Sequence, residues 1–243
     1  TKPNCGWAWN NKGSFFFGEE RYEEAAESFR QASELMPGED AFFGNLGAAL
    51  LELERYDEAL EMFEKSLELN PSVEAYSNLG SLYFYRHRYK DAIAKYHQAI
   101  ALADDQAWLW GNMAEAYFWA PGLQDSSRVY FQRAAELLDA ELREGGSAKE
   151  DRSYLATYYA RLGDRRRTLE QIEQVAAKPE LTAIEMFNLA DAHEQIGERD
   201  LALEWLAKAC AADLSIAKVE YYPGLQHMRA DTRFREIMAR YGD

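Results

Sequence analysis

The chain has 243 residues, 47% of them hydrophobic, so it can bury a full core and is not disordered. It contains only 6 prolines and 15 glycines, which favours helices over the many short turns of an all-β fold. A formal net charge of -15 argues against nucleic acid or an acidic membrane surface as a partner, because both are polyanionic.

No apolar run approaches the length of a membrane span, and the N-terminal stretch TKPNCGWAWN lacks the charged and apolar segments of a signal peptide. We therefore expect a soluble, cytoplasmic protein with no membrane partner. Cys5 and Cys210 lie near opposite ends and form no CxxC pattern. A disulfide framework or a structural zinc site is therefore not expected.

The first half of the chain repeats itself about every 34 residues, over 6–39, 40–72 and 73–106. Each copy contains a glycine, an alanine and an aromatic residue at matching offsets, and reads as two amphipathic helices joined by a short turn. One such hairpin cannot bury its apolar face alone, so stacked copies must supply the missing surface. The matching residues are Gly13, Gly47 and Gly80, then Ala25, Ala59 and Ala92, then Phe29, Phe63 and Tyr96.

Three more copies follow, over 107–140, 149–182 and 183–216, and the last two of them match more loosely. The last two are in register at 34 residues, which pairs Gly163 with Gly197. Residues 217–243 are predicted to end in a capping helix with Asp231 as its N-cap, because the apolar residues after it recur at helical spacing. Those apolar residues are Phe234, Ile237, Met238 and Tyr241.

The repeat resembles the tetratricopeptide repeat, whose units carry an aromatic residue, Leu-Gly, Ala, Phe and Pro at set offsets. The second copy matches with Phe43, Leu46, Gly47, Ala59, Phe63 and Pro71. The resemblance implies an all-α, right-handed superhelical solenoid of about six helical hairpins plus a C-terminal capping helix, in one domain spanning 1–243.

The end of the chain is similar to arrays that follow signalling modules in bacterial multidomain proteins and that close with an LRxDPRF element. Thr232 replaces the proline of that element. From this similarity, and from a start almost inside a repeat, we expect a fragment of a longer protein. The matching residues are Met228, Arg229, Asp231, Arg233 and Phe234.

Catalytic motifs are not evident. The stretch HEQIG at His193 opens like a zinc protease motif but lacks the second histidine. His87 and His97 have no adjacent cysteine or paired carboxylates, and no nucleophile elbow or nucleotide-binding glycine pattern occurs. We therefore expect no enzyme, no catalytic residues, no metal and no cofactor.

The first helices of the hairpins carry an asparagine at the same offset in five of the six copies, where the fifth copy has Tyr154 instead. In tetratricopeptide proteins this offset faces the concave groove, and an amide can pair with both N–H and C=O of a passing peptide. We expect Gly44 to clear space beside Asn45, and Gly47 to serve helix packing. The alternative is that asparagine is simply the common residue of the family at this offset. The predicted peptide-binding asparagines are Asn11, Asn45, Asn78, Asn112 and Asn188.

Aromatic residues at neighbouring offsets are predicted anchors for the bound peptide, since aromatic side chains are typical binding anchors. The competing interpretation is that several of these rings pack between hairpins. The predicted anchors are Trp7, Phe17, Phe84, Tyr85, Trp108, Phe118 and Trp119.

The same surface carries acidic residues where relatives that bind acidic chaperone tails use Lys and Arg. These include Glu115, Asp191 and Glu194, so a neutral or basic peptide or protein is the expected partner, not an acidic one. The leading hypothesis is a non-enzymatic protein–protein interaction module. The alternatives are a regulatory or substrate-recruiting arm of a larger bacterial signalling enzyme of kinase or cyclase type, and a scaffold that self-associates.

Overall fold

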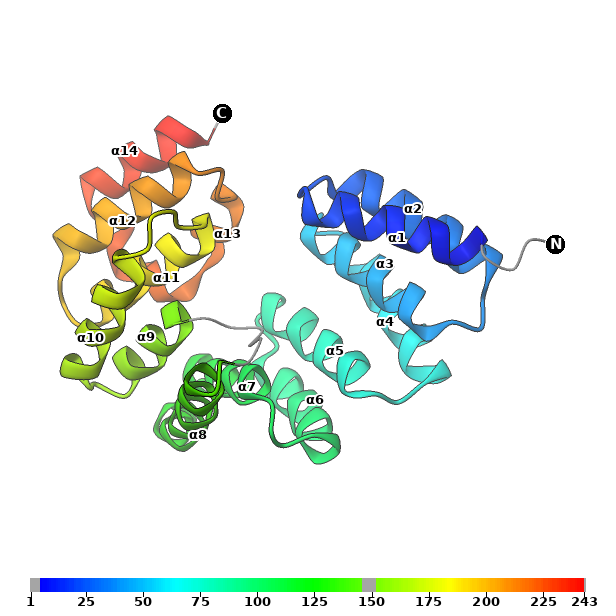
Figure 1. The fold of residues 1–243 in the computed structure, drawn as a ribbon, viewed down its shortest axis with the longest axis horizontal. Coiled ribbons are helices and arrows are strands. Elements are labelled where there is room, and N and C mark those ends of the chain that lie inside the picture. The colour runs from blue at the N-terminus through cyan, green and yellow to red at the C-terminus, as the bar shows by residue number, and fades with distance from the viewer. Residues whose placement is uncertain (1–4, 146–151, 243) are drawn as a thin grey trace. The chain divides into compact units, whose positions relative to one another are not determined.

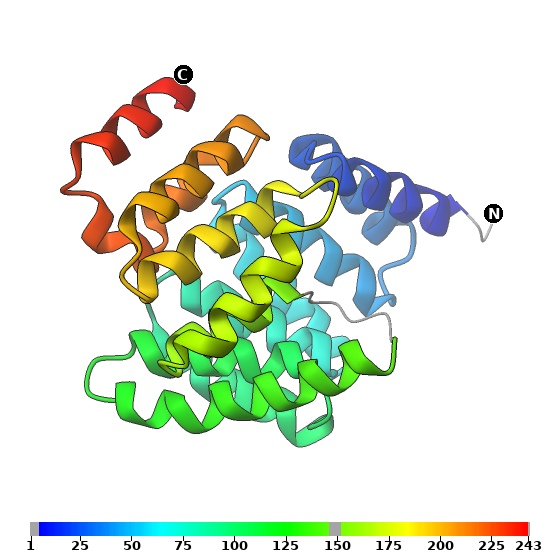
Figure 2. The same cartoon turned by 60° about the vertical axis from the view of Figure 1, so that its left-hand side comes forward.

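The computed structural model describes residues 5–145 and 152–242. Over these residues the chain forms fourteen α-helices and one short 3-10 helix, and contains no strand. Consecutive helices pair into hairpins (Figures 1 and 2). The predicted all-α fold of stacked helical hairpins is confirmed.

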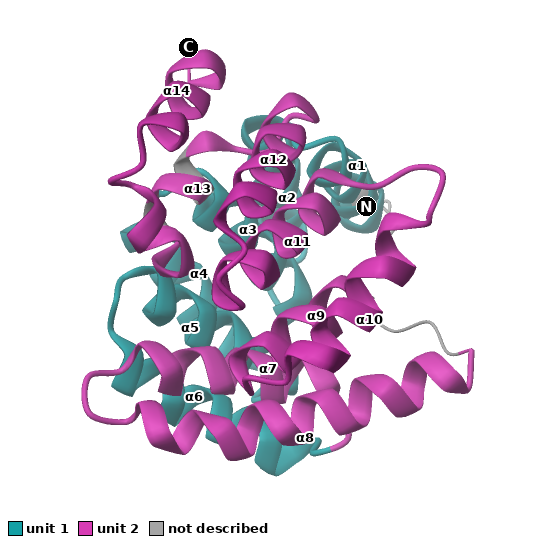
Figure 3. Ribbon diagram, turned by 90° about the vertical axis from the view of Figure 1, so that its left-hand side faces the viewer, with its two compact units in different colours: residues 1–104 teal, residues 105–243 magenta. Residues whose placement is uncertain are grey.

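Two compact units divide the chain, unit 1 over 1–104 and unit 2 over 105–243 (Figure 3). That both belong to one domain stays a prediction. The helices of unit 1 are α1 (Cys5–Gly18), α2 (Tyr22–Leu35), α3 (Asp40–Glu52), α4 (Tyr56–Leu69), α5 (Val73–Tyr85) and α6 (Tyr89–Leu102). Those of unit 2 are α7 (Ala107–Trp119), α8 (Gln124–Arg143), α9 (Arg152–Arg161), α10 (Arg165–Ala176), α11 (Ala183–Gln195), α12 (Arg199–Ala211), α13 (Ile216–Tyr221), η1 (Pro223–Met228) and α14 (Thr232–Tyr241).

Each hairpin of unit 1 is held closed by a glycine on its first helix and an aromatic ring on its second. A Cβ atom added at Gly47 would lie 2.6 Å from the ring of Phe63, and one added at Gly80 would lie 2.6 Å from the ring of Tyr96. Both rings are buried. The helices therefore approach as closely as only glycine permits, and the predicted packing role of Gly47 is confirmed.

The turn inside every hairpin contains one residue in the left-handed backbone region. In unit 2 these residues are all glycine, the residue that normally ends a helix in this way. In unit 1 none is glycine. The left-handed residues are Glu20, Glu54 and His87 in unit 1, and Gly122, Gly163 and Gly197 in unit 2.

Successive hairpins pack through the second helix of one and the first helix of the next. In unit 1, α2 contacts α3 and α4 contacts α5, around a core that includes Leu46, Leu50 and Leu79. In unit 2, α8 contacts α9, and the first helices α9 and α11 contact each other. The hairpins thus share apolar surfaces that none could bury alone.

The predicted capping helix is α14, which packs against α12. Asp231 precedes it, and the Asp231 side chain accepts a hydrogen bond of 3.0 Å from the backbone N–H of Arg233, as expected of an N-cap. Phe234 and Met238 are buried in a cluster with Leu203 and Leu206. The sequence prediction of this helix and its cap is confirmed.

Gly44 does not open a space on the surface. It is buried, and a Cβ atom added there would lie 3.4 Å from Oγ of Ser66 and 3.6 Å from Nδ2 of Asn78, at ordinary contact distances. The prediction that Gly44 clears room for a ligand is wrong, because the residue faces the neighbouring helices α4 and α5.

Candidate binding surfaces on the first helices

Four positions at i, i+4, i+7 and i+11 recur on the first helix of each hairpin. In unit 1 none of these positions is buried, and together they define what we call the unit 1 face. The unit 1 face consists of Trp7, Asn11, Ser14 and Gly18 on α1, Ala41, Asn45, Ala48 and Glu52 on α3, and Glu74, Asn78, Ser81 and Tyr85 on α5.

The asparagines of the unit 1 face lie in different surroundings. Asn11 is exposed, whereas Asn45 and Asn78 are half-buried. Nδ2 of Asn45 donates a hydrogen bond of 2.8 Å to Oδ1 of Asn10, which is itself only 8% exposed. Part of the hydrogen-bonding capacity of Asn45 therefore joins α3 to α1. Binding of a peptide by Asn11, Asn45 and Asn78 stays a prediction.

Two of the aromatic residues predicted in unit 1 are accessible and two are packed. Trp7 is 44% exposed, with its ring edge-on to Phe42 at 4.8 Å between centroids, and Tyr85 is 47% exposed. Phe17 packs on Tyr22 at 5.3 Å, and Phe84 packs on Tyr89 at 5.5 Å. Trp7 and Tyr85 are thus the rings of the predicted set that unit 1 presents for contact.

The corresponding positions in unit 2 define the unit 2 face, which is built differently. Asn112 is half-buried, but Asn188 is only 8% exposed and donates a hydrogen bond of 2.9 Å to Oγ of Ser153. The unit 2 face consists of Trp108, Asn112, Glu115 and Trp119 on α7, Tyr154, Thr157 and Arg161 on α9, and Ile184, Asn188, Asp191 and Gln195 on α11.

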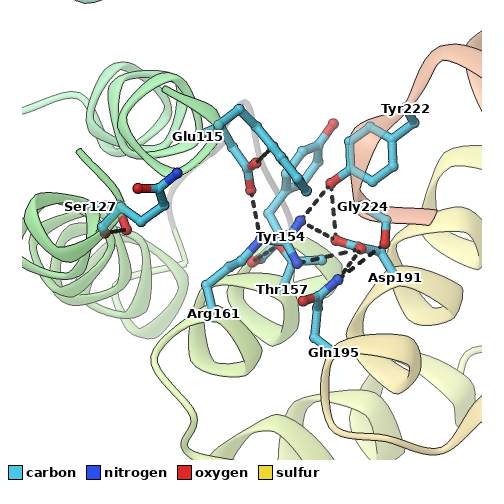
Figure 4. Close-up of polar contacts among 11 residues, drawn as sticks. Glu115, Ser127, Tyr154, Thr157, Arg161, Asp191, Gln195, Tyr222 and Gly224 are labelled. Atoms are coloured by element: carbon cyan, nitrogen blue, oxygen red, sulfur yellow. Dashed lines mark hydrogen bonds and ion pairs between the residues drawn. The ribbon is translucent and has the colours of Figure 1, made fainter. Parts of the chain in front are cut away.

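A buried ion-pair cluster lies on the unit 2 face, near the C-terminal ends of its helices (Figure 4). The side chain of Arg161 is fully buried, with Nη2 at 3.0 Å from Oδ2 of Asp191 and Nε at 3.3 Å from Oε1 of Glu115. Asp191 is 1% exposed, and Oε2 of Glu115 accepts a hydrogen bond of 2.8 Å from Nε1 of Trp119. Three first helices, α7, α9 and α11, are linked in this way.

The charges in the cluster shift one another's pKa values. Burial alone would lower the pKa of Arg161, but the carboxylates of Asp191 and Glu115 outweigh it and hold that pKa above the usual value. Burial raises the pKa of Glu115, although the nearby Arg161 opposes the rise. Asp191 and Glu115 are therefore partners of a buried cation, not a surface ready to receive a basic ligand. Glu194, the third predicted acidic residue, pairs with Arg199.

A segment near the C-terminus, which contains Tyr222 and Gly224, also contacts this cluster. Oη of Tyr222 lies 3.0 Å from Nη2 of Arg161 and donates a hydrogen bond of 3.0 Å to Oδ2 of Asp191. Nε2 of Gln195 donates to Oδ1 of Asp191 at 3.2 Å and to the carbonyl oxygen of Gly224 at 3.3 Å (Figure 4). Burial raises the pKa of Tyr222 well above its usual value, so the phenol stays protonated.

The predicted aromatic anchors of unit 2 contact the chain's own residues. Phe118 packs edge-on to Phe131 at 6.2 Å, and the guanidinium of Arg161 lies over the Phe118 ring at 4.9 Å. Trp108 is half-buried and donates a hydrogen bond of 3.3 Å from Nε1 to Oε1 of Gln106. Like Trp119, these residues have intramolecular partners, and their role in binding stays a prediction.

Within the part of the chain that the structure describes, no three His, Cys, Asp or Glu side chains are grouped to hold a metal ion. The buried His193 has its Nδ1 at 2.7 Å from Oε2 of Glu198, at the start of α12. Burial raises the pKa of the Cys210 thiol to about 11, while the side chain of Cys5 lies outside the described residues. Across the same described range, no helix combines the length and apolar character needed to cross a membrane.

Five residues that organise the two faces were not predicted from the sequence, namely Asn10, Ser153, Arg161, Gln195 and Tyr222. A signal for Arg161 was present, because alignment of the copies puts it at the same offset as Trp119 and Gln195, one helical turn from the offset of Glu115 and Asp191. Tyr222 lies outside the repeats, so the repeat period does not predict where its side chain lies.

Comparisons with known proteins agree with this architecture. Two family models described as tetratricopeptide repeat match residues 4–72 and 41–104, and residues 154–213. None of the curated proteins matches the sequence closely enough to count as a relative.

Several solved structures have a similar fold. The chain is similar to the Cut9–Hcn1 structure at 14% identity and a TM-score of 0.66, covering 100% of this chain and 43% of that one. It is similar to PilF of Pseudomonas aeruginosa at 14% identity and a TM-score of 0.58, covering 98% of both chains. It is similar to MamA 41-end of Desulfovibrio magneticus RS-1 at 20% identity and a TM-score of 0.52, covering 71% of this chain and 94% of that one.

At these identities the neighbours show the fold alone. The helical hairpins, their glycine–aromatic packing and the family matches on both units lead to one conclusion: the chain belongs to the tetratricopeptide repeat family.

Proposed function

We propose that the chain is a non-enzymatic protein–protein interaction module that binds a peptide or protein segment on the unit 1 face. Tetratricopeptide repeats are general interaction modules, which supports the broad assignment. The observation that carries the finer one is the accessibility of the unit 1 face, where Trp7 is 44% and Tyr85 is 47% exposed. Large apolar side chains left accessible beside polar groups are typical of binding surfaces.

The amides of the same face suit an extended backbone. Asn11 is exposed and Asn78 is half-buried, and each amide offers one acceptor and two donors. Such groups can pair with the N–H and C=O of a bound segment, whatever its side chains. Trp7 and Tyr85 would then provide the apolar contacts that set the strength of binding.

Charge favours a neutral or basic segment over an acidic one. The unit 1 face carries Glu52 and Glu74, and none of its positions is Lys or Arg. An acidic ligand would therefore meet like charge, whereas a lysine or arginine side chain would be attracted. Nucleic acid is disfavoured on the same grounds.

Selection of peptides tests this proposal. A displayed library of short random peptides, selected on the wild-type protein, should yield binders richer in Lys and Arg than in Asp and Glu. Their affinity should fall by about tenfold or more in Trp7→Ala and in the double variant Asn11→Ala with Asn78→Ala. The matched control is Leu35→Ala, which removes a 51% exposed leucine from the end of α2, outside the face. Equal loss in the control, or no loss in the face variants, would contradict the proposal.

Two further roles remain as proposals for the whole protein. The first is a regulatory or substrate-recruiting arm of a larger bacterial signalling enzyme in the cytoplasm, which the sequence of the full-length gene tests. The second is self-association, favoured by Phe15 on α1 and Val129 on α8, which are 61% and 70% exposed. Light scattering during size-exclusion chromatography tests it, with Phe15→Ser and Val129→Ser as variants expected to be monomeric.

A further inference from the structure

The unit 2 face is in contact with a segment of its own chain. The phenol of Tyr222 lies against both Arg161 and Asp191, with its oxygen 3.0 Å from a nitrogen of the first and 3.0 Å from an oxygen of the second. Two residues later, the carbonyl of Gly224 accepts a hydrogen bond from Gln195. A side chain and a backbone group of one short segment are thus recognised together (Figure 4).

The fit at Gly224 is close. A Cβ atom added there would lie 2.6 Å from Oδ1 of Asp191 and 2.4 Å from the ring of Tyr222, so the segment approaches the carboxylate more closely than any other residue type allows. The Tyr222 ring also packs edge-on to Phe187 of α11, at 5.1 Å between centroids. Shape, aromatic packing and hydrogen bonds therefore agree on a tyrosine at this place.

The groups that hold the segment occupy the offsets that form the unit 1 face in the other unit. Asp191 corresponds to Ser81, and Arg161 and Gln195 correspond to Tyr85. An amide pairing with a backbone carbonyl, as Gln195 does with Gly224, is also the chemistry by which an asparagine row would hold an external segment. The unit 2 face therefore contacts Tyr222 and Gly224 as a binding surface contacts a bound segment.

We propose that the unit 2 face is a binding site for a tyrosine-bearing segment, and that residues 222–225 are its built-in occupant. The site selects tyrosine because the buried Arg161–Asp191 pair requires a group that both accepts and donates a hydrogen bond, and phenylalanine provides neither. This inference concerns unit 2 alone and does not depend on what the unit 1 face binds.

In the wild-type chain, residues 222–225 fill the site. Val219, Leu225 and Met228 on either side of the contact are fully buried in the cluster that includes Leu203 and Leu206. Because the occupant is tethered, its effective concentration at the site is on the order of millimolar, so an external segment competes poorly. Weakening the contact of Tyr222 is the way to expose the site.

The test uses a labelled peptide with the sequence of residues 219–228, VEYYPGLQHM, titrated into the full chain by fluorescence anisotropy. The Tyr222→Ala variant should bind this peptide about tenfold or more tightly than wild type, since its own occupant no longer fills the phenol site. A peptide that carries Tyr222→Phe should not bind more tightly to the Tyr222→Ala protein than to wild type. Tyr241→Ala, which removes a tyrosine from α14, is the matched control and should behave as wild type.

Two results would overturn the proposal: equal peptide binding, or none, by wild type and Tyr222→Ala, and equal binding of the tyrosine and phenylalanine peptides. If Tyr222→Ala fails to fold, as judged by circular dichroism, the protein variant Tyr222→Phe replaces it. That variant keeps the ring on Phe187 and removes only the two hydrogen bonds of the phenol. It should still bind the tyrosine peptide more tightly than wild type does, and a failure to do so counts against the built-in occupant.

Discussion

Nδ2 of Asn45 donates a hydrogen bond of 2.8 Å to Oδ1 of Asn10, which joins the first helices of two successive hairpins. The same relationship recurs in unit 2, where Asn188 donates to Ser153, again 35 residues earlier. The asparagine of one copy thus pairs with the residue just before the equivalent position in the preceding copy. At these two places the recurrent asparagine stabilises the stacking of hairpins.

Removing this bond should destabilise unit 1. Asn45→Ala and Asn10→Ala should each lower the free energy of unfolding by about 1 kcal/mol, since the remaining amide is left without its partner. A double-mutant cycle by urea denaturation measures the coupling, which should be clearly non-zero. Additive effects of the two substitutions would show that the bond contributes nothing. Asn11→Ala is the control, because Asn11 is exposed and the substitution should be nearly neutral.

The two glycines that bracket Asn45 should respond in opposite directions to alanine. Gly47→Ala places a Cβ atom 2.6 Å from the buried ring of Phe63 and should destabilise the protein by about 1–3 kcal/mol. Gly44→Ala meets only ordinary contacts and should stabilise it by up to about 1 kcal/mol, because alanine is the better helix former. Urea denaturation of both variants checks the prediction, which fails if the two shifts have the same sign.

The ion-pair cluster of unit 2 should be sensitive to loss of its cation. Arg161→Met leaves two buried carboxylates without their cation, and should lower the free energy of unfolding by about 3–5 kcal/mol. Thermal unfolding followed by circular dichroism measures this loss. The triple variant Arg161→Met, Asp191→Leu and Glu115→Leu should recover much of the stability, since no charge then remains unpaired. A mild effect of Arg161→Met alone would mean that the cluster is hydrated.

Glu115 should give unit 2 a characteristic pH dependence. Burial raises the pKa of Glu115 in the folded protein above its unfolded value of about 4.3. A raised pKa favours folding while the carboxyl is protonated, so this contribution is full below the unfolded pKa and is lost as the pH rises through the folded pKa. The stability of wild type relative to Glu115→Gln should therefore decrease as the pH rises above the unfolded pKa of about 4.3. Denaturation at several pH values measures it, and a relative stability that rises with pH would contradict the assignment.

The left-handed residues of the unit 1 turns predict stabilising substitutions. Glu54 and His87 have φ of 57°, where a side chain is strained by about 1–2 kcal/mol. Glu54→Gly and His87→Gly should each increase the free energy of unfolding by up to about 1 kcal/mol, after the larger chain entropy of glycine is subtracted. The control is Gly163→Ala in unit 2, which should be destabilising because that residue has φ of 74°. Chemical denaturation measures all three.

Much of the fold was predictable because its determinants are local and repeat. The glycine and aromatic residues that close each hairpin of unit 1 recur every 33 or 34 residues, and the apolar faces of the helices recur with them. The capping helix carried its own signals in Asp231 and the apolar spacing after it. Each of these features is set by neighbours in sequence or by one copy stacking on the next.

The candidate surfaces were less predictable, because sequence position does not reveal a side chain's partner. Asn45 and Asn11 share an offset, yet Asn45 is half-buried and bonded to Asn10 whereas Asn11 is exposed. From the sequence alone, Asp191 is interpreted as an acidic surface residue, because its contact with Arg161 is not evident. The hydrogen bond from Arg161 to Tyr222 joins residues that are 61 positions apart, and Tyr222 lies outside the repeats. Such contacts depend on the folded chain and not on the period.

The residues in the turns also predict different dynamics for the two units. The strain at Glu20, Glu54 and His87 is released whenever a turn opens, whereas Gly122, Gly163 and Gly197 have none to release. Amide hydrogens at the unit 1 turns should therefore exchange with solvent faster than those at the unit 2 turns. The ends of the unit 1 hairpins should therefore loosen more readily than those of the unit 2 hairpins. This freedom would let their helices adjust to a bound segment while the packed interior stays intact.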